Sequence, residues 1–196
     1  MPKPKTPSGE QDRRVRKTRR QLHEALINLI LERGWDEVSV QDVCERADVG
    51  RSTFYVHFAD KEELLLIGLD DLHQMLAQAG TQEKGRFAFA EGLIEHARDK
   101  ARLLRAIIGK RGCPNVQRQF REVVMQLVQS ELADLEIEEK QRQVIVRFIG
   151  GGLAELLTTW IDRPSNVDVT AMASTFRQLT LGALATFAPK KSRSPR

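Results

Sequence analysis

The sequence predicts an all-α fold, and three observations support that prediction. Apolar residues recur at intervals of three and four along most of the 196 residues, as on one face of a helix. From Lys84 onward, apolar and polar residues alternate over no more than a few positions, so no β-strand is indicated. Capping residues and short breaks rich in Gly, Pro or Asn separate the apolar runs and divide the chain into helices.

Composition narrows the class of protein. Apolar residues make up 41% of the chain and charged residues 30%, as in a globular protein folded in water. We expect no membrane span, since no apolar run is judged long enough, and no signal peptide. The two cysteines, Cys44 and Cys113, provide no disulfide framework and favour a cytoplasmic location. Cys44 lies on an apolar helix face, whereas Cys113 lies in a turn and is a candidate for exposure.

The chain begins with a basic segment. Residues 1–12 are rich in Pro and are predicted to be a disordered arm, and a helix is predicted over 13–33. Residues 1–20 contain eight lysines and arginines and two acidic residues, and the tail over 189–196 adds four basic residues. The segment between them has an acidic excess, although the net charge is +4. This asymmetry indicates that one pole binds a polyanion or, alternatively, that the basic ends are solubilising arms.

A short helix and a tight turn follow. Ser39 and Asp42 are spaced to form a capping box at the start of a helix over 40–47. Asp48 begins a three-residue turn and tolerates the left-handed backbone that such a turn uses. A helix of this length is not stable alone, because nucleation is costly, so it must pack on longer neighbours.

The second short helix is predicted over 51–58. Phe54 and Phe58 are four residues apart and face inward together, which leaves the polar residues on the outer faces. Asp60 is expected to cap the next helix, which runs over 61–79 and continues beyond the first group of helices.

A helix, a three-residue turn and a second helix form the geometry that places a helix in the major groove of DNA. A helical corner in an unrelated all-α protein has the same periodicity. The residues distinguish the two, because ADVGRSTFYVHFADKEELL over 47–65 resembles the DNA-binding domain of the tetracycline-repressor (TetR) family of bacterial regulators. The resemblance extends from about Arg13 to about Gly68. The chain departs from the family at Asp48, where Gly is frequent, and at Gly50, where Ser is frequent.

The resemblance implies about nine helices, with a DNA-binding domain over 13–60 and an effector-binding and dimerisation domain over 61–188. It also implies that helix 51–58 enters the major groove of double-stranded DNA. The residues that match the family's contacts are Arg51, Ser52 and Thr53 for base edges, Tyr55 and His57 for phosphates and sugars, and Lys61 and Ser39 for flanking phosphates. The basic charge next to the motif adds Arg19 as a further candidate for DNA contact.

Five more helices are predicted, over 84–98, 100–109, 114–135, 138–162 and 168–187. The fourth of them contains Gly150, Gly151 and Gly152, which cost a helix roughly 2–3 kcal/mol relative to alanine. That cost predicts either the close approach of another helix or a kink at a pocket wall. The last two helices are apolar on more than one face, which indicates a central core helix or a subunit interface.

The resemblance favours an interface between two copies and implies a pocket for a small effector. The residues expected at the homodimer interface are Phe148, Leu153, Leu156, Trp160, Met172, Phe176, Leu179 and Leu184. The candidates for the effector pocket, each explained equally well as packed core, are Leu72, Met75, Phe87, Ile94, Leu104, Ile107, Phe120, Val124 and Phe148.

The sequence does not indicate an enzyme or a cofactor. It contains no nucleophile elbow, no zinc-protease motif, no phosphate-binding glycine loop and no metal-ligand spacing of Cys and His. The prediction is therefore a homodimeric repressor that binds a palindromic operator and is released by an unidentified small molecule. The alternative is a constitutive or architectural DNA-binding protein that needs no effector, and activation rather than repression stays open.

Overall fold

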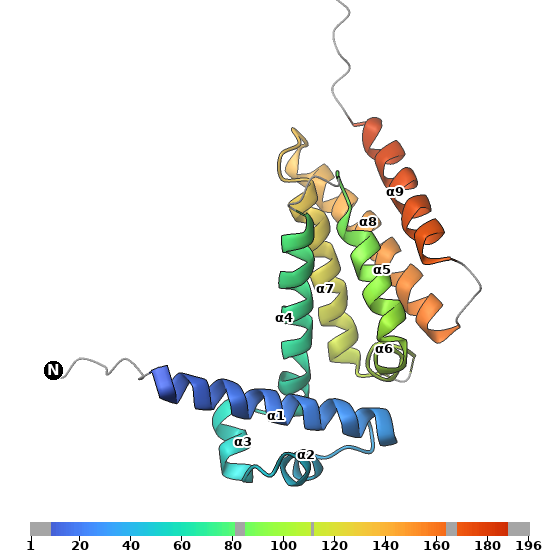
Figure 1. Ribbon diagram of the computed structural model, residues 1–196. Helices are drawn as coiled ribbons and strands as arrows, with labels where there is room; N and C mark the ends of the chain where they lie inside the picture. Colours follow the sequence, from blue (N-terminus) through green and yellow to red (C-terminus); the bar gives the residue numbers. More distant parts are fainter. Residues whose placement is uncertain (1–8, 81–84, 111, 164–167, 188–196) are drawn as a thin grey trace, which may run out of the picture. The chain divides into compact units, whose positions relative to one another are not determined.

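The computed structural model describes residues 9–80, 85–110, 112–163 and 168–187 (Figure 1). Within those residues the chain forms nine α-helices and no β-strand, which confirms the predicted fold class. The helices are α1 (Gly9–Arg33), α2 (Val40–Ala47), α3 (Arg51–His57), α4 (Lys61–Gly80), α5 (Phe89–Asp99), α6 (Ala101–Ile107), α7 (Pro114–Glu131), α8 (Glu139–Asp162) and α9 (Val169–Ala185). The predicted tail over 189–196 and the first eight residues of the predicted arm lie outside the described residues.

The chain divides into two compact units, and the boundary is crossed inside α4, at the start of α6 and inside α7. The first unit takes in residues up to Asp71 together with 102–119, and the second takes in 72–101 and the residues from Phe120 onward. The first half of α4 therefore belongs to one unit and its second half to the other, as expected for a helix shared between two domains. The sequence had placed the domain boundary at residue 60, just before this helix.

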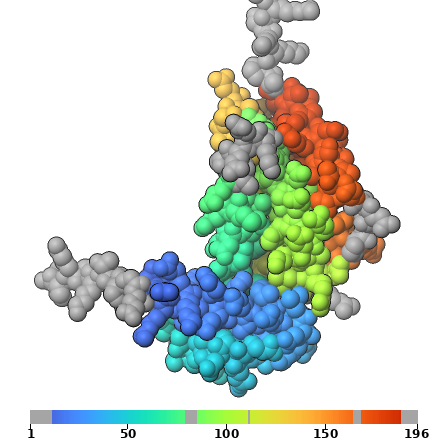
Figure 2. Space-filling model, in the orientation of Figure 1, coloured from blue at the N-terminus to red at the C-terminus, as the bar shows by residue number. Residues whose placement is uncertain are grey.

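The core of the first unit lies beneath α1. This helix starts at Gly9, so residues 9–12 are helical and not part of a disordered arm. Leu22 and Leu26 of α1 are fully buried, as are Phe54 and Leu64 of the same unit. α1 packs on α2, and α2 packs on α3 (Figure 1). Figure 2 shows these three helices, in blue to cyan, as one continuous surface.

The second unit is built around α5, which packs on α8 and α9. α5 starts at Phe89 and not at residue 84, because Phe87 has a left-handed backbone (φ 61°) in the turn before it. At Gly150 of α8, an added Cβ would lie 2.9 Å from the Cγ and 3.2 Å from the Cα of Met125 in α7. This confirms the close approach of another helix that the glycine triplet predicted.

One expectation about α8 was wrong. By length and composition alone this helix is long and apolar enough to cross a membrane, although no run of that kind was expected. Its inner side is buried within the second unit at Ile145, Ile149, Leu153 and Leu157, as in the core helix of a helical bundle.

Candidate nucleic-acid interface

Local hydrogen bonds determine where α2 starts and how the turn after it runs. The Asp42 amide donates to Ser39 Oγ (3.2 Å) and the Ser39 amide donates to the Asp42 carboxylate (2.9 Å), so the predicted capping box is present. The Ser39 hydroxyl also donates to that carboxylate. These bonds from Ser39, with the smaller effect of Arg33, lower the pKa of Asp42. Asp48 ends α2 with a left-handed backbone (φ 53°), as predicted, whereas Gly50 has an ordinary φ of −62°.

One side of α3 is anchored by aromatic rings. Phe54 and Phe58 are buried, as predicted, and their ring centroids lie 5.7 Å apart. The Arg19 guanidinium of α1 lies over the Phe58 ring, with its Cζ 5.0 Å from the ring centroid. This cation–π contact places a cationic side chain of α1 at the end of α3.

The other side of α3 is exposed and mostly polar. Arg51, Ser52, Thr53 and Tyr55 are all exposed, and His57 at the end of the helix is half-buried. Val56 is also exposed, although no role was predicted for it. The structure therefore brings five of the eight predicted DNA-contacting residues together on one short helix.

Lys61 at the start of α4 binds within the protein. Its ammonium donates to the carbonyl oxygens of Trp35 (2.9 Å) and Val38 (2.7 Å). It also lies over the Trp35 ring, 4.2 Å from the centroid. Two of its three N–H bonds thus hold the connection between α1 and α2, which leaves one for a phosphate. The contact spans more than twenty residues of sequence, and local periodicity gives no sign of it.

The next residue of α4 is joined to the start of α7 within the same unit. Asn115 Nδ2 donates to the Glu62 carboxylate at 3.0 Å. Cys113 beside them is only 1% exposed, so its expected exposure was wrong. Burial raises the pKa of its thiol, as does the nearby carboxylate of Glu62, although two backbone hydrogen bonds act in the opposite direction. A thiol kept protonated in this way is a poor redox sensor.

Two protein-family models match this chain. Residues 22–66, which include α2 and α3, match the model described as bacterial regulatory proteins of the tetR family. Residues 87–182 match the model of a transcriptional regulator C-terminal region. The chain belongs to the TetR family. It is therefore classed with DNA-binding transcriptional regulators and not with enzymes, as its sequence predicted.

Individual relatives agree with the assignment to TetR. The regulator TcmR of Streptomyces glaucescens is 33% identical over 76 residues, which span 38% of this chain and about a third (34%) of TcmR. A TetR regulator from Streptococcus agalactiae has a similar fold, with a TM-score of 0.67 at 24% identity over 86% of this chain and 96% of that one. FadR of Thermus thermophilus, solved in complex with lauroyl-CoA, gives a TM-score of 0.61 at 16% identity over 91% of this chain and 99% of that one.

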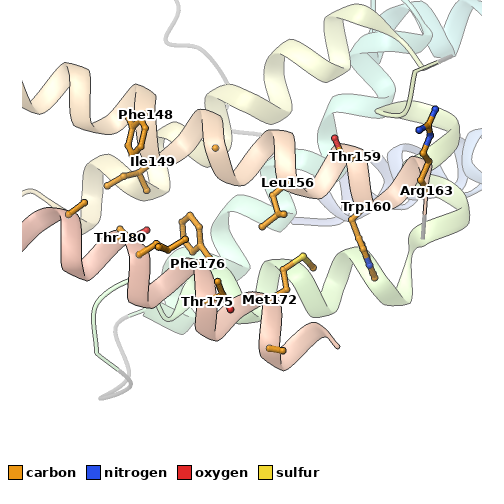
Figure 3. Close-up of a pocket in the computed structure, with 14 residues that line it drawn as sticks. Phe148, Ile149, Leu156, Thr159, Trp160, Arg163, Met172, Thr175, Phe176 and Thr180 are labelled. Carbon is orange, nitrogen blue, oxygen red and sulfur yellow. The ribbon is translucent and has the colours of Figure 1, made fainter. Parts of the chain in front are cut away.

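A second candidate site of this TetR-family chain is an apolar groove between α8 and α9, with a volume of about 790 Å³ (Figure 3). Leu156 of α8 and Met172 and Phe176 of α9 lie between the two helices. Phe148 and Leu179 line the groove and remain 75% and 70% exposed. A large contiguous apolar surface of this kind marks an interaction site more often than single exposed apolar residues do.

The eight residues predicted for a dimer interface fall into two groups. Six of them line the groove: Phe148, Leu156, Trp160, Met172, Phe176 and Leu179. Leu153 and Leu184 point into the protomer and are buried there, so their assignment to the surface was wrong. Met172 lines the groove but is also largely buried. The outer face of each helix was not separable from its inner face by sequence, because both faces are apolar.

The nine residues predicted for an effector pocket stay a prediction. Phe148 lines the α8–α9 groove, and Phe87 lines a smaller hollow of about 310 Å³ between α5 and α9. Met75 is 48% exposed, which contradicts its expected burial. The remaining six are buried: Leu72, Ile94, Leu104, Ile107, Phe120 and Val124.

Proposed function

We propose that this protein is a homodimeric transcriptional repressor that inserts α3 of each copy into the major groove of a palindromic operator. The division of α3 into a buried aromatic side and an exposed polar side carries this proposal. Arg51, Ser52 and Thr53 supply donors and acceptors that fit base edges. Tyr55 and His57 sit beside them and are assigned to phosphates and sugars.

Charge supports the same surface. The exposed basic residues of α1 include Arg19, whose guanidinium lies at the end of α3. We assign Arg19 to a phosphate next to the groove that α3 enters. Lys61 and Ser39 have most of their donors engaged within the protein, so we assign them a smaller share of phosphate binding.

Selection of bound duplexes from a random DNA pool tests the proposal. We expect a palindrome whose half-sites lie about one helical turn apart, because a two-fold dimer presents two copies of α3. Arg51→Ala should lower affinity for the selected sequence by about 1–3 kcal/mol and relax preference at one position of each half-site. Arg121→Ala, which removes an exposed arginine from α7, is the matched control and should leave affinity unchanged. A pool that yields no enriched sequence contradicts the proposal.

The α8–α9 groove supports a second copy of the chain as the partner. Its exposed Phe148 and Leu179 would be covered in a dimer, and obligate dimer interfaces are apolar in the same way. We expect a dimer by light scattering at micromolar concentration and a monomer for Phe148→Glu. Met75→Glu, which places the same charge on an exposed apolar position of α4, should leave the dimer intact. A monomeric wild type excludes this arrangement.

We further propose that a small apolar molecule bound in the second unit releases the operator. The support is analogy, since FadR of Thermus thermophilus was solved with lauroyl-CoA and shares this fold. A thermal-shift screen of apolar and cationic compounds, followed by operator release, tests this directly. Hits that stabilise the protein and release the operator support an effector. Compounds that stabilise it without releasing DNA favour the effector-independent alternative.

A further inference from the structure

Val56 lies on the exposed side of α3, with 78% of its surface accessible. Successive residues of an α-helix are rotated by about 100°, so Val56 lies about 200° from Phe54 and from Phe58, on the opposite side of the helix. Ser52 and Thr53 precede Val56 by four and three residues and are its neighbours on that face. Val56 is also the most exposed large apolar side chain among the described residues.

Among the described residues of the first unit, no packing contact accounts for a valine at this position. Valine is a poorer helix former than alanine, and this side chain buries little surface in return. A lone exposed apolar residue is common and needs no explanation by itself. Its place at the centre of an otherwise polar face is what matters, because that face is the one proposed to enter the major groove.

We propose that Val56 selects thymine at one position in each operator half-site. This inference rests on the proposed function. The C5 methyl of thymine is the only methyl group that the four bases present in the major groove, and the other groups used for base readout there are hydrogen-bond donors or acceptors. The two methyl groups of Val56 can pack against the thymine methyl. An amino or carbonyl group of another base at that position would find no hydrogen-bond partner on valine. Ser52 and Thr53 then hydrogen-bond the adjacent bases.

Replacement of thymine by deoxyuridine isolates this contact. Deoxyuridine keeps every hydrogen-bonding group of thymine and lacks only the C5 methyl. We expect one thymine in each half-site at which the replacement weakens binding about fourfold, the effect of exposing one buried methyl group. The same replacement should have a smaller effect on Val56→Ala and on Val56→Thr, since each of these side chains offers fewer methyl groups to the thymine methyl than valine does. Val144→Ala is the matched control, because it shortens a similarly exposed valine of α8, and it should keep the wild-type response.

The outcomes separate this inference from the proposed function. A deoxyuridine effect that is present in wild type and clearly reduced in Val56→Ala supports the contact. An effect of equal size in both proteins, or no sensitive thymine at all, overturns the role of Val56 and leaves operator binding by α3 intact. Failure to enrich any sequence from the random pool overturns both.

Discussion

Gly150→Ala adds one methyl group to α8 and so tests how closely α8 packs on α7 in the second unit. The added Cβ would lie 2.9 Å from the Cγ and 3.2 Å from the Cα of Met125. At Gly151 and Gly152 of the same helix, an added Cβ meets nothing within 4 Å. A glycine-to-alanine substitution can therefore be made at a crowded position of α8, Gly150, and at an open one beside it, Gly151.

The expected changes in the free energy of unfolding have opposite signs for Gly150→Ala and Gly151→Ala. Alanine is favoured over glycine in a helix interior by about 1 kcal/mol, so Gly151→Ala should stabilise the protein by about 0.5–1 kcal/mol. At Gly150 the neighbour includes the backbone of α7, and overpacking of this kind costs about 1–3 kcal/mol. We therefore expect Gly150→Ala to lower the free energy of unfolding by up to about 2 kcal/mol, so that the two variants differ by about 1–3 kcal/mol.

Urea unfolding measures this difference, at one protein concentration because the stability of a dimer depends on concentration. Gly152→Ala belongs in the same series, since Gly152 lines the α8–α9 groove and its variant also reports on the proposed dimer. Equal unfolding free energies for Gly150→Ala and Gly151→Ala would refute the close contact between α7 and α8.

Three further substitutions test the first unit. Hydrogen bonds from Ser39 lower the pKa of Asp42, so the stability that this carboxylate provides is present at neutral pH and lost as pH falls. The difference in melting temperature between wild type and Asp42→Asn should shrink on acidification, and a constant difference would contradict the capping role. Burial lowers the pKa of His23 below its ordinary 6.5, so folding should weaken as pH falls below that value. His23→Leu should lose less stability than wild type between neutral and mildly acidic pH, and parallel curves would show that His23 is not the cause. Lys61→Met should destabilise the protein without DNA by about 1.5–3 kcal/mol, since two carbonyls lose a charged donor, and an unchanged melting temperature would leave Lys61 with DNA binding alone.

The helix-turn-helix was predictable in detail because its signals are local. Ser39 and Asp42 form a capping box three residues apart, and α2 starts where that box places it. Asp48 takes the left-handed backbone for which its short side chain is suited. Phe54 and Phe58 stand one helical turn apart and are buried together. Each of these features depends on residues within one turn of one another.

Features that depend on distant residues were missed. Lys61 meets the carbonyls of Trp35 and Val38, and Glu62 meets Asn115, across 23 to 53 residues of sequence. No periodicity within a single helix records such pairs. The burial of Cys113 was missed for the same reason, since its surroundings come from another part of the unit.

The dimer face was only partly predictable. Phe148 and Leu153 lie on the same apolar helix, yet one is exposed and the other is buried. A helix that is apolar all round carries no stripe to separate the face toward its own core from the face toward a partner. The exposure of Val56 was not predicted, because a valine on a short helix does not by itself show whether it faces the core or the solvent.

Protection of an introduced thiol tests the central claim, that the exposed face of α3 enters DNA. Both natural cysteines are buried, so a cysteine introduced at an exposed position reports on that position alone. The measurement is the alkylation rate of Thr53→Cys with and without saturating operator, beside Ser130→Cys, which carries its thiol on an exposed position of α7. We expect the operator to slow alkylation of Thr53→Cys in proportion to the fraction bound and to leave Ser130→Cys unchanged. Equal rates for Thr53→Cys in free and bound protein would contradict the account.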